Sequence, residues 1–213
     1  TWVGFQNFID FFTGPFFFRL IKNTVILGVL DLVINFTAPV VFALLLNEIT
    51  RKRFKKLVQT ISYMPYFISA VVVCGLIISF TQSGGVISNL VSFLYGGESV
   101  NLLSKSEAFR PIFILSNMWQ GLGYGSIIYL AALSGIDQEL YEAAVVDGAG
   151  RWKQTLHITI PGIMPTIIIM LIMRMGMVFA VGGDKILLLY SPAIYDTDDV
   201  INTYVYRIGI QQY

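Results

Sequence analysis

The chain has 213 residues, of which 55% are hydrophobic and only 13% are charged. A water-soluble domain usually carries about 25% charged residues, so this composition argues against a soluble globular protein and favours a membrane protein. The formal net charge of +1 gives no information about partners, and the single cysteine, Cys74, cannot form a disulfide within the chain.

Long apolar runs follow one another along the chain. A membrane-spanning helix needs about 20 mostly apolar residues. Four runs meet this requirement: Thr24–Leu46, Met64–Thr81, Ile112–Leu133 and Ile163–Val181. A fifth begins near Val200, close to the end of the sequence. Because neither end resembles a natural terminus, we expect an internal fragment of a longer multi-pass membrane protein.

Lysine and arginine residues in short loops predict the orientation of these spans, because such loops stay in the cytoplasm. The expected loop Arg51–Lys56, RKRFKK, has five positive charges in six residues and is therefore predicted to be cytoplasmic. Residues 137–161 follow two spans later and are predicted to lie on the same side. The segments Gln82–Pro111 and Gly182–Asp199 are then expected outside.

Residues 137–161 form a polar segment between two apolar runs, and they predict a helix, a break and a second helix. Asp137 is a suitable N-cap, while Gly148 and Gly150 allow a sharp turn. Apolar residues then recur at four-residue spacing, at Trp152, Leu156 and Ile160. Pro161 is expected to reset the chain before the next span. On pattern alone, this fits an amphipathic hairpin at the membrane surface with no partner.

The stretch EAAVVDGAGRWKQTLHITIP within this segment resembles the EAA loop of permease subunits of bacterial ABC importers. The family pattern is Glu-Ala-Ala, three residues, Gly, nine residues, Ile, one residue, Leu-Pro. In this sequence it falls on Glu142, Ala143, Ala144, Gly148, Ile158, Ile160 and Pro161. The single departure is Ile160 in place of Leu, which keeps an apolar side chain.

The resemblance implies a coupling loop that docks into a cleft on a separate ATP-binding subunit. Its residues would be Glu142, Ala143, Ala144, Asp147, Gly148, Ile158 and Pro161. In that family the glutamate meets a basic residue, the alanines allow close approach, and the glycine makes the bend. ATP and magnesium are expected on the partner, because this chain has no Gly-Lys pair for a P-loop. No metal site is expected either, since His157 has no second histidine or cysteine at metal-ligand spacing.

The resemblance extends through nearly the whole chain. WVGFQNF resembles an external segment of sugar-importer permeases of the maltose type. TISYMPYFISAVVVCGLI, MWQGLGYGSIIYLAALSGID and DKILLLYSPAIYDTDDVINTYVYRIGI resemble a subgroup associated with oligosaccharides, polysaccharides and uronate-bearing sugars. The implied fold is an all-α, multi-pass transmembrane bundle of the type I ABC importer permease kind. Residues 1–213 would form one transmembrane domain that is incomplete at both ends, with residues 137–161 as a cytoplasmic coupling-helix hairpin. Such permeases have six spans, so the first and most of the last would be missing here.

The resemblance also implies the setting, a bacterial cytoplasmic membrane. Its protein partners there would be a second permease, two ATP-binding subunits and an external solute-binding protein. Its substrate would be a carbohydrate, and no nucleic acid would be bound. It would not itself be an enzyme.

An ion-gradient-driven sugar transporter is the alternative, but it would favour several intramembrane carboxylates, and Asp31 is the one acidic residue within a predicted span. A membrane-embedded enzyme would need a carboxylate pair, a histidine cluster or a nucleophile with its base, which the spans lack.

Polar and aromatic residues at membrane depth are candidates for the translocation path. The third run carries Asn117, Trp119, Gln120 and Tyr124, which suit sugar hydroxyls and stacking on sugar rings. Hydrogen bonding between helices is the alternative role. Arg174 in the fourth run lies at nearly the depth of Asp31, from a rise of about 1.5 Å per residue. We therefore expect Arg174 to pair with Asp31, or else to meet a sugar carboxylate in the path.

Overall fold

The computed structural model describes residues 4–211, and among them no β-strand is present. The described residues form two compact units. The first unit contains the described parts of Thr1–Asp31, Ile68–Ser116 and Met177–Tyr213, and the second contains Leu32–Phe67 and Asn117–Gly176. The segment WVGFQNF, which resembles an external segment of sugar-importer permeases, begins at Trp2. Its first two residues therefore lie outside the described range.

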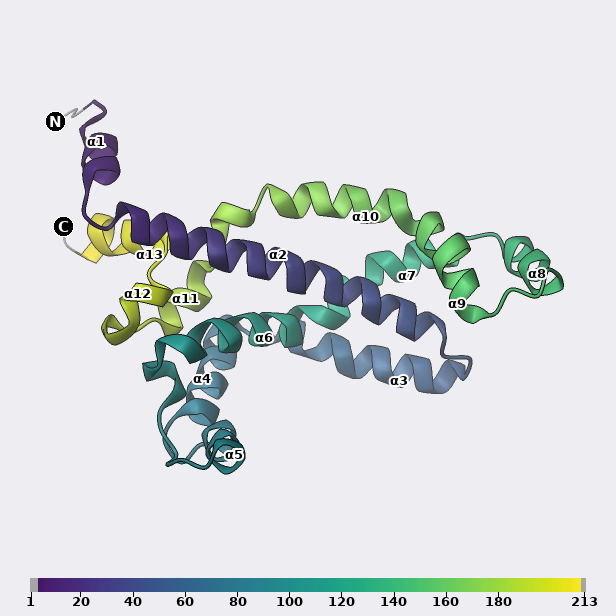
Figure 1. Cartoon of the computed structure of the whole chain (residues 1–213), viewed down its shortest axis with the longest axis horizontal. Helices are drawn as coiled ribbons and strands as arrows, with labels where there is room; N and C mark the ends of the chain where they lie inside the picture. The colour runs from purple at the N-terminus through teal and green to yellow at the C-terminus, as the bar shows by residue number, and fades with distance from the viewer. Residues whose placement is uncertain (1–3, 212–213) are drawn as a thin grey trace. The chain divides into compact units, whose positions relative to one another are not determined.

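The α-helices are labelled in Figure 1. In chain order they are α1 (Gln6–Thr13), α2 (Phe17–Asn47), α3 (Lys52–Tyr63), α4 (Ala70–Thr81), α5 (Val86–Tyr95), α6 (Ser106–Gly125), α7 (Ile127–Ser134), α8 (Gln138–Val146), α9 (Arg151–Gln154), α10 (Ile160–Met175), α11 (Gly183–Leu189), α12 (Tyr195–Asp198) and α13 (Ile201–Tyr206). Short 3-10 turns occur at Met64–Phe67, Leu102–Ser104, Val178–Ala180 and Pro192–Ile194, and π-helical turns at Thr155–Thr159 and Arg207–Gln211.

Within residues 4–211, three helical stretches are long and apolar enough to cross a membrane, namely Phe17–Asn47, Ala70–Tyr95 and Arg151–Met175. They correspond to the first, second and fourth predicted runs. The third predicted run is helical but not continuous, because α6 ends at Gly125 and α7 begins at Ile127. Ser126 is buried between them, and its Oγ donates to the carbonyl oxygen of Gly123 at 2.6 Å. The Ser126 backbone N–H donates to the same carbonyl at 3.1 Å, so Ser126 supplies two hydrogen bonds at this helix end, where carbonyls lose their intrahelical partners.

Segments that the sequence predicted as loops are largely helical. The basic run Arg51–Lys56 is not a loop, because α3 begins at Lys52. Lysine and arginine are good helix formers, so a cluster of them marks the end of a span without preventing a helix. Likewise, Gln82–Pro111 contains α5 and the start of α6, and Gly182–Asp199 contains α11 and α12.

A polar cluster connects the three chain segments of the first unit. Asn23, near the start of α2, is fully buried. Its Nδ2 donates to the carbonyl oxygens of Asp196 and Asp199, both at 3.0 Å. From α6, Arg110 Nη2 donates to Asn23 Oδ1, also at 3.0 Å. Figure 1 shows α12 and α13 beside the start of α2. The Asn23 amide therefore bonds the backbone of α12 and of the residue that follows it.

The carboxylate of Asp199 is the charged centre of the same cluster. It is completely buried and accepts from two arginines: Arg19 Nη2 at 3.1 Å and Arg207 Nη2 at 2.8 Å. Arg207 Nη1 donates to Asp199 Oδ1 as well, at 3.2 Å, and Thr203 Oγ1 donates to the same oxygen at 2.9 Å. A buried charge is costly unless it is paired and hydrogen-bonded, and Asp199 meets both conditions through α2 and α13.

The neighbouring Asp198 is also completely buried, and its Oδ2 accepts from the Ser191 backbone N–H at 2.7 Å. The pKa of its carboxyl is raised to about 6, mainly because the group is buried. The Ser191 hydrogen bond lowers the pKa, and the nearby charge of Asp199 raises it. Arg19 and Arg207, from the two ends of the first unit, converge on Asp199 beside this second buried carboxyl.

The second unit has an apolar core between α2, α7 and α10. Its buried members are Ala43, Tyr129, Leu133 and Ile163. Close helix approach depends on Gly162, because a Cβ there would lie 2.9 Å from the side chain of Ile136. The core therefore fixes the start of α10 against the residues that lead into α8.

We expect Asp199→Asn to destabilise the protein. The substitution leaves two arginines without a carboxylate in a buried site, and breaking such a pair costs about 3–5 kcal/mol. Glu48→Gln is the matched control, because it removes the exposed pair of Arg151 and Glu48, which is worth at most about 1 kcal/mol. Thermal unfolding in detergent should show a much lower Tm for Asp199→Asn only. Equal Tm values for the two variants would contradict this role of Asp199.

Candidate coupling hairpin and translocation path

The predicted bend of the hairpin is present and has a defined hydrogen-bonding pattern. The Gly148 N–H donates to the Val145 carbonyl at 3.0 Å, and the Ala149 N–H donates to the Ala144 carbonyl at 2.8 Å. These two bonds are the Schellman arrangement that ends many helices, and it requires a left-handed residue after the helix. Gly148 provides it, with a φ of 75°. The glycine of the motif is therefore required by its backbone conformation.

Side-chain hydrogen bonds stabilise the two arms of the hairpin. Asp137 caps α8 by accepting from the Glu139 backbone N–H at 3.0 Å, as predicted. Tyr141 in α8 is hydrogen-bonded through its hydroxyl to Thr159 Oγ1 at 3.0 Å. Gln154 Nε2 donates to the Ala149 carbonyl at 2.7 Å. Tyr141 and Thr159 could not be selected from the sequence, because an isolated polar pair 18 residues apart has no recognisable spacing.

The predicted coupling residues divide by exposure. Glu142, Ala143, Asp147 and Gly148 are exposed, whereas Ala144 is half-buried. Ile158 is half-buried within the π turn, and Pro161 is exposed. Residues 137–150 contain four acidic side chains and no lysine or arginine. The end of the hairpin is thus an acidic, exposed surface.

Pro161 does not separate α9 from α10, which corrects the prediction of a break there. The helix continues from Arg151 through the π turn into α10, and Figure 1 shows this continuity. In the π turn, the Ile160 N–H donates to the Thr155 carbonyl. Proline lacks an N–H, and its position at the start of α10 falls directly after this wider turn, where a regular bond is already lost.

An aromatic cluster lies where α6 ends. The rings of Tyr66 and Tyr124 are stacked with centroids 3.8 Å apart and planes 5° apart, and Phe67 contacts Tyr124 edge-on. The backbones approach closely here, because a Cβ on Gly123 would collide with the backbone of Ser62. Tyr66 and Tyr124 are still 46% and 43% exposed. Tyr124 was predicted for the path, whereas Tyr66 was missed because it lies in a 3-10 turn rather than on a helix face.

The other predicted path residues do not all share this face. Helix geometry places Asn117, Gln120 and Tyr124 on one side of α6, because their spacings are three, four and seven residues. Trp119 lies two residues from Asn117 and therefore about 200° away around the helix. Asn117 and Gln120 are half-buried, and Trp119 is 46% exposed. Trp119 thus does not join the group that contains Tyr124.

The family of binding-protein-dependent transport system inner membrane components matches residues 35–181. The chain belongs to this permease family. It is 44% identical to the polygalacturonan/rhamnogalacturonan transport system permease protein YteP of Bacillus subtilis, over 99% of this chain and 66% of that protein.

Solved structures agree with the family assignment. The permease matches a bacterial ABC transporter involved in the import of the acidic polysaccharide alginate, with a TM-score of 0.94 and 46% identity, over 99% of this chain and 74% of that one. It also matches a bacterial alginate ABC transporter in complex with an alginate pentasaccharide-bound periplasmic protein, with a TM-score of 0.93 and 46% identity, over 99% of this chain and 73% of that one. The all-α permease fold predicted from the sequence is therefore confirmed.

Arg174 lies in the last turn of α10, which ends at Met175. A cation in the last turn interacts favourably with the helix dipole, which contributes to its stability there. Asp31 belongs to the first unit and Arg174 to the second. Their pairing, like contact of Arg174 with a sugar carboxylate, stays a prediction.

Gly148→Ala should loosen the hairpin of the permease. A left-handed conformation costs a non-glycine residue about 1–2 kcal/mol, so the Ala149 amide, which closes the turn, should exchange its hydrogen about 5–30 times faster. Gly150→Ala is the control, because Gly150 has an ordinary φ of −70°. A Cβ would meet nothing within 4 Å at either position. Hydrogen exchange read by mass spectrometry checks this, and equal exchange in both variants would contradict the role of φ.

Proposed function

We propose that this permease is one of two membrane subunits of an ATP-driven importer in a bacterial cytoplasmic membrane. It forms part of the translocation path for a carbohydrate that an external solute-binding protein delivers. Two ATP-binding subunits hydrolyse ATP and bind the magnesium, since the chain carries no P-loop lysine of its own. Residues 51–56 and 137–161 face the cytoplasm in this proposal.

The hairpin is the observation that carries the coupling role. Its end presents Glu142 and Asp147 on an exposed surface without a neighbouring lysine or arginine in residues 137–150. Such a surface complements a basic cleft on another protein. Ala143 next to Glu142 is small and exposed, which lets the partner backbone come close. The bend at Gly148 holds α8 away from α9, so that the end of the hairpin can enter a cleft.

The names of the similar proteins support a carbohydrate substrate. YteP is named for polygalacturonan and rhamnogalacturonan, and the solved structures for alginate. We infer an oligosaccharide or polysaccharide fragment as the substrate class. The stacked rings of Tyr66 and Tyr124 suit it, because sugar rings have apolar faces that lie against aromatic side chains. The half-buried amides of Asn117 and Gln120 can serve its hydroxyl groups.

Glu142→Lys should uncouple ATP hydrolysis from transport. A lysine would face the basic cleft expected on the ATP-binding subunit, and like charges across an interface are repulsive. In the reconstituted transporter, uptake of the labelled oligosaccharide should fall at least about tenfold, as expected for a loss of roughly 1.4 kcal/mol or more, while basal ATP hydrolysis persists.

Glu98→Lys is the charge-matched control for this variant. Glu98 is exposed and lies in the segment predicted outside, so its uptake should match that of the wild type. Full uptake by Glu142→Lys in a correctly inserted transporter would refute the coupling role of this residue.

Tyr124→Ala should raise the KM for uptake about 2- to 10-fold, because an aromatic contact contributes about 0.5–1.5 kcal/mol beyond its buried area. Tyr124→Phe keeps the ring and should keep the wild-type KM. Trp119→Ala, on the opposite side of α6, should leave KM unchanged. Uptake measured over a range of concentrations of the loaded binding protein checks all three. A larger effect for Trp119→Ala than for Tyr124→Ala would assign the path to the other helix face.

A further inference from the structure

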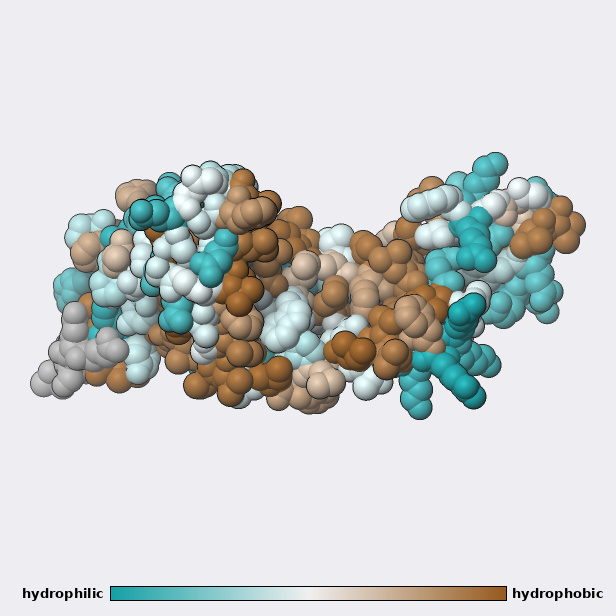
Figure 2. Space-filling view, turned by 90° about the horizontal axis from the view of Figure 1, so that it is seen from below, coloured by the Kyte–Doolittle hydropathy of each residue, from teal (hydrophilic) through white to brown (hydrophobic). Residues whose placement is uncertain are grey.

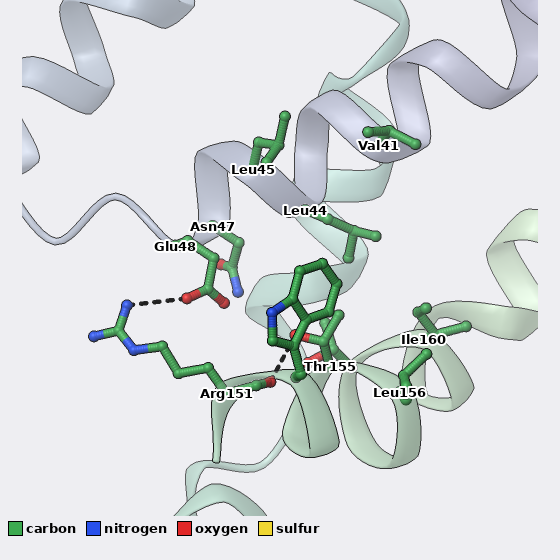
Figure 3. A pocket seen from close by; sticks show the side chains of 11 residues that line it. Val41, Leu44, Leu45, Asn47, Glu48, Arg151, Thr155, Leu156 and Ile160 are labelled. Carbon is green, nitrogen blue, oxygen red and sulfur yellow. Dashed lines mark hydrogen bonds and ion pairs between the residues drawn. The ribbon is translucent and has the colours of Figure 1, made fainter.

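An apolar groove lies between the end of α2 and the helix that begins with α9, entirely within the second unit. Its volume is about 410 Å³. Figure 3 shows Val41, Leu44 and Leu45 of α2 on one wall and Leu156 and Ile160 on the other. The predicted apolar stripe of the hairpin is therefore one wall of this groove, and it does not belong to the acidic end of the hairpin.

Large apolar side chains stay exposed along the groove. Trp152 is 82% exposed, Leu45 62% and Leu156 55%, and all three line the groove. Contiguous exposed apolar side chains mark a surface that contacts a partner or a membrane. Tryptophan in particular is enriched where hydrocarbon meets the headgroup region, because its ring is apolar and its N–H is a donor.

The polar end of the groove holds an ion pair and leads to a cationic run. Arg151 Nη1 lies 3.2 Å from Glu48 Oε2, and the side chains are 73% and 47% exposed. Figure 3 draws this pair as a dashed line. The groove ends at Glu48, and the cationic run Arg51–Lys56 begins three residues later, at the start of α3. Residues 151–176 contribute further cations, including Lys153, and no acidic residue. Figure 2 shows hydrophilic side chains gathered at one end of the view, next to an apolar band.

Charge is therefore sorted within a short distance. Residues 137–150 carry only acidic charge, whereas residues 51–56 carry only basic charge. A basic cleft on a protein suits the first surface and would be repelled by the second. An anion with an apolar tail suits the groove, because its tail can lie against the leucines while its charge meets the cations.

We propose that this groove binds an anionic phospholipid of the inner leaflet. One acyl chain lies between α2 and α10, against Leu45 and Leu156. The phosphate lies near Arg51–Arg53, at the level of Trp152. The lipid thus contacts the helix that joins the hairpin to the membrane span. This site requires only that the hairpin faces the inner leaflet, and it does not depend on which substrate is transported.

The test uses the complete transporter in nanodiscs of equal amounts of phosphatidylglycerol and phosphatidylcholine with identical acyl chains. Leu156 is replaced by the photo-cross-linker p-benzoylphenylalanine, and the adducts are identified by mass spectrometry. We expect phosphatidylglycerol adducts to exceed phosphatidylcholine adducts several-fold. The same cross-linker at Val146, at the end of α8, should give no lipid adduct. Cross-links from position 156 to an ATP-binding subunit or to the second permease would overturn the proposal.

A charge variant separates a specific site from ordinary contact with the bilayer. Arg51→Gln/Lys52→Gln/Arg53→Gln, combined with the cross-linker at 156, should lower the ratio of phosphatidylglycerol to phosphatidylcholine adducts by about tenfold or more, since each cation near an anionic surface contributes roughly fivefold in affinity. Lys105→Gln is the control, because Lys105 is exposed in the first unit. Equal labelling of the two lipids in the unsubstituted background, or an unchanged ratio in the triple variant, would refute the site. Because cross-linking does not require uptake, a transporter that fails to import sugar still gives a decisive answer.

Discussion

Every interruption of a helix releases backbone groups that need new hydrogen-bond partners, and within the hydrocarbon of a membrane no water can supply them. The second unit meets this requirement in three different ways. At the break after α6, the hydroxyl of Ser126 bonds the carbonyl of Gly123. At the hairpin, the left-handed conformation of Gly148 lets the N–H groups of Gly148 and Ala149 donate to carbonyls at the end of α8. Before Pro161, a π turn takes up the register that the proline would otherwise break. The residues proposed for coupling and for the path lie at or next to these three points.

The first unit solves the same problem with side chains from distant parts of the sequence. Asn23 caps two carbonyls that lie more than 170 positions away in the chain, and Arg19 and Arg207 neutralise Asp199. Burying these groups is costly, and what they provide is a fixed arrangement of α2, α6 and the C-terminal helices. Hydrogen bonds in a buried network are directional and strong, so this network favours one geometry of these elements.

The sequence predicts those features that depend on residue type at fixed spacing. Apolar runs, the N-cap at Asp137 and the turn at Gly148 all follow from local rules, and the structure contains them. The continuity through Pro161 could not be predicted, because it depends on a π turn that has no residue signature. The stacking of Tyr66 on Tyr124 depends on the close approach of Gly123 to Ser62, which is a tertiary contact. The basic run was misread as a loop because positive charge reports the side of the membrane and not the secondary structure.

The unbroken helix from Arg151 to Met175 also has a geometrical consequence. Its 25 residues span about 37 Å at a rise of about 1.5 Å per residue. If this segment turns as one rod about the end that joins the hairpin, a rotation of about 5° displaces its far end by about 3 Å. A flexible joint at Pro161 would absorb such a rotation. Because the helix continues past the proline, the rotation would instead move the residues around Arg174 the farthest.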